Sequence, residues 1–172
     1  KAYPVDRYAE HFSKPEKTQA LPTLAEIGFQ PTNLSQLKLP TGMAGGLQLF
    51  EDFKTRMSHY ADARNFPAVK GVSYLSTHLR FGTISIRHLA REAFHLANIG
   101  AQTWLNELIW RDFYFQILHH HPQISAGKSF KPEFEYLAFE NNSDWFQAWC
   151  VGKTGYPLVD AAMRQLNQTG YM

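Results

Sequence analysis

The stretch WLNELIWRDFYFQILHH, residues 104–120, decides the fold of this chain. It contains no proline or glycine, and apolar side chains occupy almost every helical phase. The pattern therefore predicts a buried helix, with Thr103 as its N-cap. One stripe of this helix, at i, i+3, i+4 and i+7, carries a carboxylate, an indole, a guanidinium and a phenol. These side chains are Glu107, Trp110, Arg111 and Tyr114.

The charged residues Glu107 and Arg111 admit two interpretations. An i,i+4 pair in this order is often a solvated ion pair on a helix surface, which contributes about 0.2–0.5 kcal/mol. The apolar residues on the other faces, however, leave little room for a side that contacts water. We therefore interpret the stripe as the wall of a pocket, where charged and aromatic groups converge on a ligand.

The rest of the chain predicts more helices and no alternating strand, so the predicted fold class is all-α. In the first predicted helix, Leu49, Phe53, Met57 and Tyr60 share one face. Ser85 is the expected N-cap of the third. Trp145 and Trp149, at i and i+4, are interpreted as core. The predicted helices cover residues 47–60, 77–81, 86–98, 104–120, 143–152 and 157–170.

Residues 1–46 have the character of a connector. Five prolines and the segment TGMAGG at 41–46 interrupt every periodic run, and only residues 22–28 predict a short helix. So long a segment without strong secondary structure is unusual inside a compact domain. We therefore predict a linker over 1–46 and a helical domain over 47–172.

Composition limits the class of protein. The chain has 172 residues, 44% of them hydrophobic and 15% aromatic, which is enough for a sizeable core. The single Cys150 excludes an internal disulfide framework and fits a reducing compartment. No run of 18 apolar residues and no leader pattern is present, so we expect a cytoplasmic protein with no membrane partner. The adjacent histidines at 119–121 point in different directions on a helix, and no metal site is predicted.

Positive charge concentrates in residues 54–91. A basic cluster of this kind is typical of a protein that binds a phosphate backbone, although arginines on a helix exterior are often only solvated. Asp62 is the one carboxylate in the segment. Its basic residues are Lys54, Arg56, Arg64, Lys70, Arg80, Arg87 and Arg91.

The loop NFPAVKGVSYLS at 65–76 leads into the second predicted helix. Ser73 and Ser76, together with unpaired backbone N–H groups at a helix start, could hold a phosphate. The alternative is that these serines only cap the helix. Neither GxGxxG nor GxxxxGK[ST] occurs, so neither a Rossmann nor a P-loop site is predicted.

Four blocks of the sequence resemble the DNA photolyase and cryptochrome family, and are most similar to bacterial class I cyclobutane pyrimidine dimer photolyases. The resemblance extends over essentially the whole chain. The resemblance implies the helical FAD-binding domain of that family in truncated form, after an interdomain linker. The blocks are LPTLAEIGF at 21–29, FPAVKGVSYLSTHLRFGTIS at 66–85, WLNELIWRDFY at 104–114 and GKTGYPLVDAAMRQLNQTGYM at 152–172.

The resemblance also implies roles for individual residues. Glu107 and Trp110 match the catalytic carboxylic acid that hydrogen-bonds the lesion and the indole that packs on it. Residues that match FAD contacts of the family are Tyr60, Val72, Ser73, Tyr74, Leu75, Ser76 and Trp104. Residues that match the DNA-facing side are Arg64, Glu107, Leu108, Ile109, Trp110, Arg111, Asp112, Phe113 and Tyr114.

The activity implied by the resemblance is light-driven repair of pyrimidine dimers in UV-damaged DNA, by electron transfer from excited reduced FAD. A cryptochrome, a blue-light receptor with little repair, is the alternative, and a helical DNA-binding module without a cofactor is a third possibility. Two residues depart from the family: Val72 replaces a common threonine, and Phe139 lies near the usual outer tryptophan of flavin photoreduction.

The resemblance also concerns the extent of the chain. Further flavin and lesion contacts are expected beyond Met172, and an antenna chromophore is expected only in a domain before residue 1. We therefore expect the isolated segment to be inactive and to bind FAD weakly or not at all. The full-length protein is expected to be a monomer.

Overall fold

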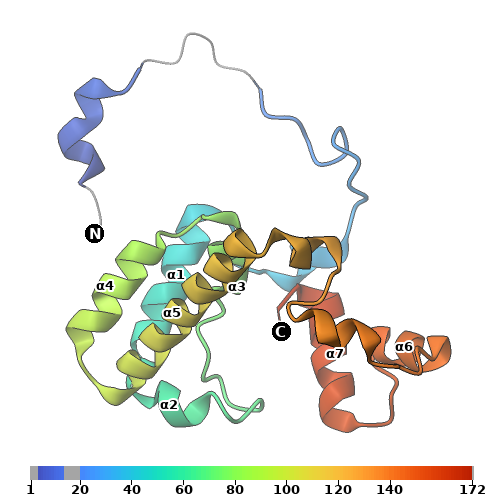
Figure 1. Cartoon of the computed structure of the whole chain (residues 1–172). Helices are drawn as coiled ribbons and strands as arrows, with labels where there is room; N and C mark the ends of the chain where they lie inside the picture. The colour runs from blue at the N-terminus through green and yellow to red at the C-terminus, as the bar shows by residue number, and fades with distance from the viewer. Residues whose placement is uncertain (1–3, 14–19, 172) are drawn as a thin grey trace. The chain divides into compact units, whose positions relative to one another are not determined.

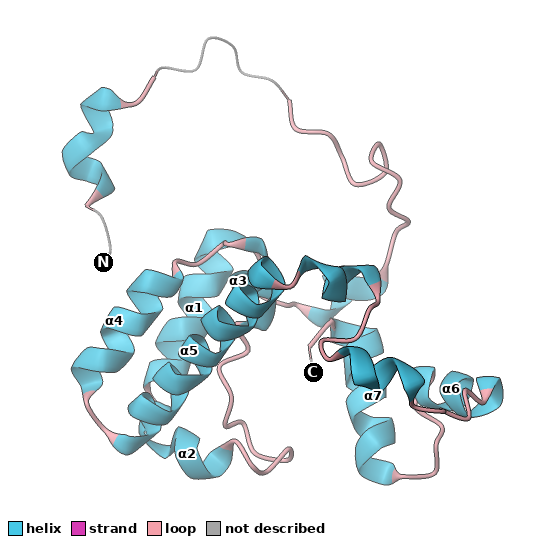
Figure 2. Ribbon diagram, viewed as in Figure 1, coloured by secondary structure: helices cyan, strands magenta, loops and turns pink. Residues whose placement is uncertain are grey.

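A computed structural model describes residues 4–13 and 20–171 of the chain. The chain divides into two compact units, Lys1–Leu39 and Pro40–Met172. Both consist of helices, turns and loops, and no strand occurs in the two described ranges (Figure 1, Figure 2). The all-α prediction is confirmed. No helix in the described part of the chain has the length and apolar character needed to cross a membrane.

The first unit contains two 3-10 helices, η1 (Val5–His11) and η2 (Asn33–Leu37). The short helix predicted at 22–28 is wrong in extent, because the structure has one turn there. The Thr23 N–H donates to Glu26 Oε2 at 2.7 Å, and the Glu26 N–H donates to Thr23 Oγ1 at 3.3 Å. This reciprocal capping satisfies the first turn, and Gly28 then ends it at φ 87°.

The second unit holds all the longer helices. Their order follows the sequence, with short 3-10 segments between them, two of which lie between the helices predicted at 104–120 and 143–152. The elements are α1 (Gly42–Lys54), η3 (Met57–His59), α2 (Tyr60–Ala63), α3 (Ser76–Phe81), α4 (Ile86–Leu96), α5 (Ile99–His120), η4 (Pro122–Ala126), η5 (Pro132–Tyr136), α6 (Ser143–Cys150) and α7 (Pro157–Thr169).

Helix α1 begins at Gly42, before the predicted start at Leu47. The glycines that indicated a break lie inside the helix, because the packing there has no room for side chains. A Cβ at Gly45 would overlap the Pro40 backbone, and one at Gly46 would press on the ring of His78. Tertiary contact has overridden the low helix propensity of glycine.

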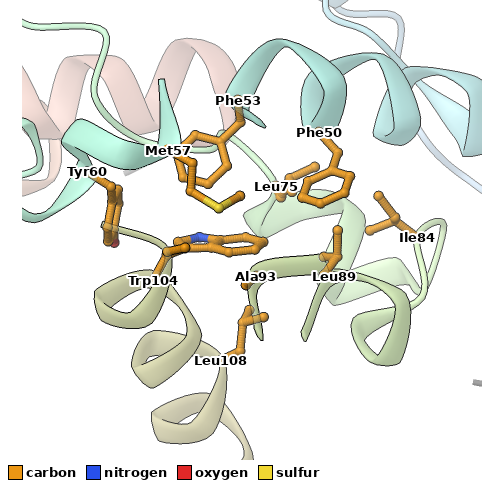
Figure 3. Packing of buried hydrophobic residues seen from close by; sticks show 11 residues of the cluster. Phe50, Phe53, Met57, Tyr60, Leu75, Ile84, Leu89, Ala93, Trp104 and Leu108 are labelled. Atoms are coloured by element: carbon orange, nitrogen blue, oxygen red, sulfur yellow. The ribbon is translucent and has the colours of Figure 1, made fainter. Parts of the chain in front are cut away.

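The core of the second unit forms where α1, η3, α4 and α5 meet (Figure 3). Phe50 and Phe53 of α1 are fully buried and lie against the indole of Trp104, with ring centroids 5.9 and 5.0 Å apart respectively. Leu49, predicted for this face, is only partly buried. Each fully buried side chain of this size contributes about 1.5–3 kcal/mol. The other core members are Met57, Tyr60, Leu75, Ile84, Leu89, Ala93, Ala101 and Leu108.

Helix α5 begins at Ile99, so the prediction of Thr103 as its N-cap was wrong. Asn98 caps the helix, with its Oδ1 accepting the Ala101 N–H at 2.9 Å. Gly100 lies in the first turn and packs directly on η3, where a Cβ would overlap the carbonyl oxygen of Met57. Gly100 therefore allows the backbones of α5 and η3 to touch, and it lies inside the helix and not in a preceding loop.

The prediction that residues 104–120 form a buried helix is confirmed only for the first part. Trp104 and Leu108 are buried, but no residue of α5 after Leu108 is. The apolar and aromatic side chains of the second half face solvent in this structure. Trp145 and Trp149 of α6 are also exposed, so their interpretation as core was wrong. The exposed α5 side chains are Ile109, Trp110, Phe113, Tyr114, Phe115 and Leu118.

Helix α7 begins at Pro157, and Gly170 ends it in the left-handed region, as predicted. Asp160 and Arg164, at i and i+4, form an ion pair at 3.8 Å, but the shorter contacts of Asp160 are elsewhere. Its Oδ1 accepts the Thr154 N–H and hydroxyl, each at 2.7 Å. The Thr154 hydroxyl, and then the backbone N–H groups of Thr154 and Gly155, hold the pKa of Asp160 below its usual range.

Candidate functional site

The centre of the candidate site is an ion pair between Arg64 and Glu107. Arg64 follows α2 directly, and its Nη1 donates to Glu107 Oε1 on α5. The solvated ion pair of Glu107 with Arg111, the alternative interpretation from sequence, does not form, because each side chain has another partner. The two partners are only partly exposed, at 33% and 39% of their side-chain area. The hydrogen bond from Arg64 to Glu107 raises the pKa of Arg64, which keeps the guanidinium charged.

Tyr60 lies beneath this pair. The Arg64 guanidinium is 5.4 Å from the centre of the Tyr60 ring, close enough for a cation–π contact. Burial raises the pKa of the Tyr60 hydroxyl, and the nearby positive charge of Arg64 partly opposes that rise. Tyr60, Arg64 and Glu107 therefore form one contiguous group between α2 and α5.

Arg111 turns away from Glu107 toward α3. Its Nη2 donates to the Leu79 carbonyl oxygen at 3.1 Å, and its guanidinium lies 4.5 Å from the centre of the Phe115 ring. Arg111 thus stabilises the end of α3 and covers an aromatic side chain. The four-residue stripe predicted from sequence is divided between an ion pair, a helix contact and an aromatic pair.

The aromatic pair is Trp110 with Tyr114. Their rings stack at 6.0 Å with 30° between the planes, and Phe113 meets the indole edge-on at 5.4 Å. Trp110 is 53% exposed and Tyr114 is 59% exposed. An exposed indole supported by neighbouring rings presents a flat apolar face on which another ring can stack.

The other candidate DNA contacts fall into two groups. Ile109, Asp112 and Phe113 are exposed on the same helix as Trp110. Leu108 is 6% exposed and belongs to the hydrophobic core. The structure therefore places Arg64 against Glu107 and Phe113 against Trp110, while Leu108 contacts the interior.

A separate pocket of about 280 Å³ lies along the loop that precedes α3. Five predicted cofactor contacts line it: Val72, Ser73, Tyr74, Leu75 and Ser76. Tyr60 and Trp104 are not in its wall but lie in the core beneath α1. The remaining lining residues are Arg64, Phe66, Pro67, Val69, Gln165 and Tyr171.

Sequence reasoning missed Gln165 and Tyr171, which reach this pocket from α7 and the residues after it. The Thr77 hydroxyl donates to the Tyr171 hydroxyl oxygen at 3.2 Å, and the Tyr171 ring meets Tyr74 edge-on at 6.0 Å. Thr77 and Tyr171 are 94 positions apart. No local pattern signals such a contact, although Tyr171 lies within the block 152–172 that carries the family resemblance.

The loop adopts an unusual backbone conformation at Tyr74, where φ is 55°. A non-glycine residue in the left-handed region costs free energy and persists only when its surroundings hold it. Tyr74 lines the pocket and contacts Tyr171. Strain of this kind is frequent at ligand sites.

Several basic residues of segment 54–91 are paired with carboxylates in the folded structure, which reduces the net positive charge of this region. Lys54 pairs with Glu51 at 2.7 Å, and Asp52 accepts contacts from both Arg56 and Lys70 at 2.6 and 2.9 Å. Glu51 and Asp52 lie just before residue 54, so the charge count over residues 54–91 did not include them. Much of the charge expected to meet a phosphate backbone is therefore already paired.

Comparison with known proteins identifies the class. The sequence model of the protein family described as the FAD binding domain of DNA photolyase matches residues 104–172 of this chain. A deoxyribodipyrimidine photo-lyase of Vibrio cholerae is 45% identical over 130 residues, 73% of this chain and 28% of the relative. The Escherichia coli enzyme of the same name is 42% identical over 130 residues, with the same coverage. The chain thus spans 28% of the length of these relatives.

Solved structures agree with the sequence matches. A class III photolyase from Agrobacterium tumefaciens matches 92% of this chain and 35% of its own, with a TM-score of 0.80 and 31% identity. An archaeal photolyase from Sulfolobus tokodaii, with two FAD molecules, matches 76% and 28%, with a TM-score of 0.59 and 38% identity. The helices are those of the helical FAD-binding domain of photolyases. The chain belongs to the DNA photolyase and cryptochrome family.

Proposed function

We propose that this chain is the first part of the FAD- and DNA-binding helical domain of a deoxyribodipyrimidine photo-lyase, preceded by an interdomain linker. The function is the light-driven repair of cyclobutane pyrimidine dimers in UV-damaged DNA by a cytoplasmic, monomeric full-length protein. The observation that carries this proposal is the exposed, ring-supported indole of Trp110, three residues after the Glu107 carboxylate on α5.

The residues present suit part of an FAD molecule. The pocket beside residues 72–76 offers the hydroxyls of Ser73 and Ser76 and the positive charge of Arg64, a donor set that fits phosphate oxygens. Val72 contributes no hydroxyl. A volume of about 280 Å³ is below the usual range for a drug-sized ligand, so the pocket suits the phosphates and not the whole cofactor.

Each site residue has a physical task in this proposal. Trp110 provides a ring face for an extruded pyrimidine, and such stacking contributes roughly 1–3 kcal/mol per base. Glu107 holds a carboxyl group at the lesion, and Arg64 orients it through their ion pair. The electron that opens the cyclobutane ring comes from photoexcited reduced FAD when that cofactor is bound.

The test uses the full-length protein with reduced flavin and an oligonucleotide that contains a thymine dimer. Recovery of unmodified thymines is followed under blue light and in the dark. We expect light-dependent repair that is lost in Glu107→Ala and in Trp110→Ala. The matched controls are Glu92→Ala, which removes a carboxylate of similar exposure paired with Arg91, and Trp145→Ala, which removes another exposed indole.

The other outcomes separate the alternatives. Bound flavin without repair would indicate a cryptochrome. Salt-sensitive DNA binding with no flavin, indifferent to the lesion and to light, would indicate a DNA-binding module. For the isolated segment 1–172 we expect weak FAD binding or none, and a purified sample with stoichiometric flavin absorbance would refute that expectation.

A further inference from the structure

We propose that Arg56 is a positioning residue that holds the pocket loop in the conformation that receives the cofactor. Arg56 lies outside the pocket wall and matches none of the cofactor or DNA contacts named above. This inference rests on the proposed FAD site, because its functional consequence is cofactor affinity.

The Arg56 guanidinium joins the end of α1 to Val72, one of the loop residues that line the pocket. Its Nη1 donates to the Asp52 carbonyl oxygen at 2.8 Å and to Asp52 Oδ2 at 2.6 Å. Its Nη2 donates to the Val72 carbonyl oxygen at 2.9 Å. The Arg56 side chain is only 17% exposed. Hydrogen bonds from a charged donor that is largely shielded from water are among the stronger ones in proteins.

The loop is held at two neighbouring positions as well. Lys70 pairs with Asp52 Oδ2 at 2.9 Å, so Asp52 receives one cation from the end of α1 and one from the loop. The hydrogen bonds from Lys70 and then Arg56 lower the pKa of Asp52. Gly71 packs so closely on α2 that a Cβ would overlap Ala63. Three consecutive loop residues, 70 to 72, are therefore fixed to the helices.

The anchored residues lead directly into residues 72–76, five consecutive residues that line the pocket. Tyr74, two positions after Val72, is the residue with the strained left-handed backbone. A strained loop conformation is maintained only if contacts on either side hold it. A loop already ordered before binding loses less conformational entropy when the ligand arrives, which raises affinity. The Arg56 contact with Val72 supplies this order at a residue of the pocket wall.

The geometry requires an arginine. Its forked guanidinium reaches the Asp52 carboxylate and the Val72 carbonyl oxygen with different nitrogens, whereas a lysine ammonium is a single point charge. The Arg56 Nε is buried without a hydrogen-bond partner in the described structure. The two Nη groups therefore carry all of the polar contacts of this side chain.

Lys54 offers a closely matched control. Lys54 and Arg56 both pair with a carboxylate one turn earlier, Glu51 and Asp52 respectively. Each cation also lies 5.4 Å from the centre of a core phenylalanine ring. Arg56 makes two additional bonds, to the Asp52 and Val72 carbonyl oxygens, and of these only the Val72 bond reaches the pocket loop.

The experiment compares Arg56→Gln, Arg56→Lys and Lys54→Gln in the full-length protein. Apoprotein is titrated with FAD, and backbone amide hydrogen exchange of residues 72–76 is measured before FAD is added. We expect Arg56→Gln to weaken FAD binding about tenfold, the loss of one charge-assisted hydrogen bond, and to speed exchange in the loop. Arg56→Lys should lie between Arg56→Gln and wild type, and Lys54→Gln should match wild type in both measurements.

Thermal unfolding separates positioning from general destabilisation. We expect the FAD affinity of Arg56→Gln to be reduced even at temperatures far below its unfolding midpoint. Backbone amide hydrogen exchange in α4 and α5 should be the same as in wild type. Wild-type FAD affinity and wild-type loop exchange in Arg56→Gln would overturn the inference. If wild type itself binds no FAD, the proposed function fails. The inference about Arg56 is then tested by hydrogen exchange alone: faster exchange of residues 72–76 in Arg56→Gln than in wild type supports it, and unchanged exchange overturns it. If Arg56→Gln does not fold, the same comparison is made with Arg56→Lys.

Discussion

Arg64 and Glu107 lie 43 positions apart in the sequence and form an ion pair across the contact between α2 and α5. The pair fixes the orientation of a carboxylate that would otherwise be within reach of Arg111 on its own helix. It also brings the positive charge of Arg64 over the Tyr60 ring. Helix packing and the geometry of the candidate lesion site are therefore linked through one contact.

The ion pair should matter more for function than for stability. Both partners are about one-third exposed, so we expect a double-mutant cycle of Arg64→Gln and Glu107→Gln, measured by urea unfolding, to give a coupling of less than about 1 kcal/mol. Each single variant should still lower the yield of light-driven repair. A coupling of several kcal/mol would show instead that the pair is mainly a structural element.

Trp110→Ala should weaken recognition of damaged DNA selectively. The loss of one stacking platform predicts a reduction of roughly 1–3 kcal/mol in the free energy of binding to a thymine-dimer oligonucleotide. Binding to undamaged DNA and the flavin content should not change. Fluorescence anisotropy titrations check this, with Trp145→Ala as the control, and an equal loss for both kinds of DNA would contradict the proposed role.

Gly100→Ala tests whether packing or helix propensity governs the start of α5. Propensity alone predicts a gain of about 1 kcal/mol in the free energy of unfolding. A Cβ at Gly100 would, however, overlap the carbonyl oxygens of Met57 and Ser58, so we expect a net loss of about 1–3 kcal/mol. Chemical denaturation gives the sign directly, and a more stable variant would mean that η3 can move away from α5.

Asp160→Asn should destabilise the turn before α7, and the effect should depend on pH. The folded state lowers the pKa of Asp160, chiefly through the Thr154 hydroxyl. The stabilisation is therefore fully present at neutral pH. It is lost only as the pH falls below the ordinary aspartate pKa of about 3.9 and through the lowered pKa of the folded state. Unfolding midpoints of wild type and Asp160→Asn should differ at pH 7 and approach each other as the pH is lowered below about 4. A constant difference would assign the effect to packing.

The sequence by itself determined the all-α class, the start of α4 at its Ser85 cap, the bounds of α7 from Pro157 to Gly170, and the position of the loop before α3. These features depend on local chemistry. A cap, a proline at the first turn and a glycine in the left-handed region each act within a few residues, so a linear pattern contains them.

Only the tertiary structure decided the partner of Glu107, the helical state of Gly45, Gly46 and Gly100, and the entry of Tyr171 into the pocket. It also showed that the second half of α5 is exposed, whereas periodicity predicted a buried helix. The glycines, the ion pair and the pocket wall share one physical reason, which is contact between distant parts of the chain. Glycines that break isolated helices are favoured where two backbones must touch, and an ion pair or a pocket wall forms between residues whose distance in sequence carries no local signal.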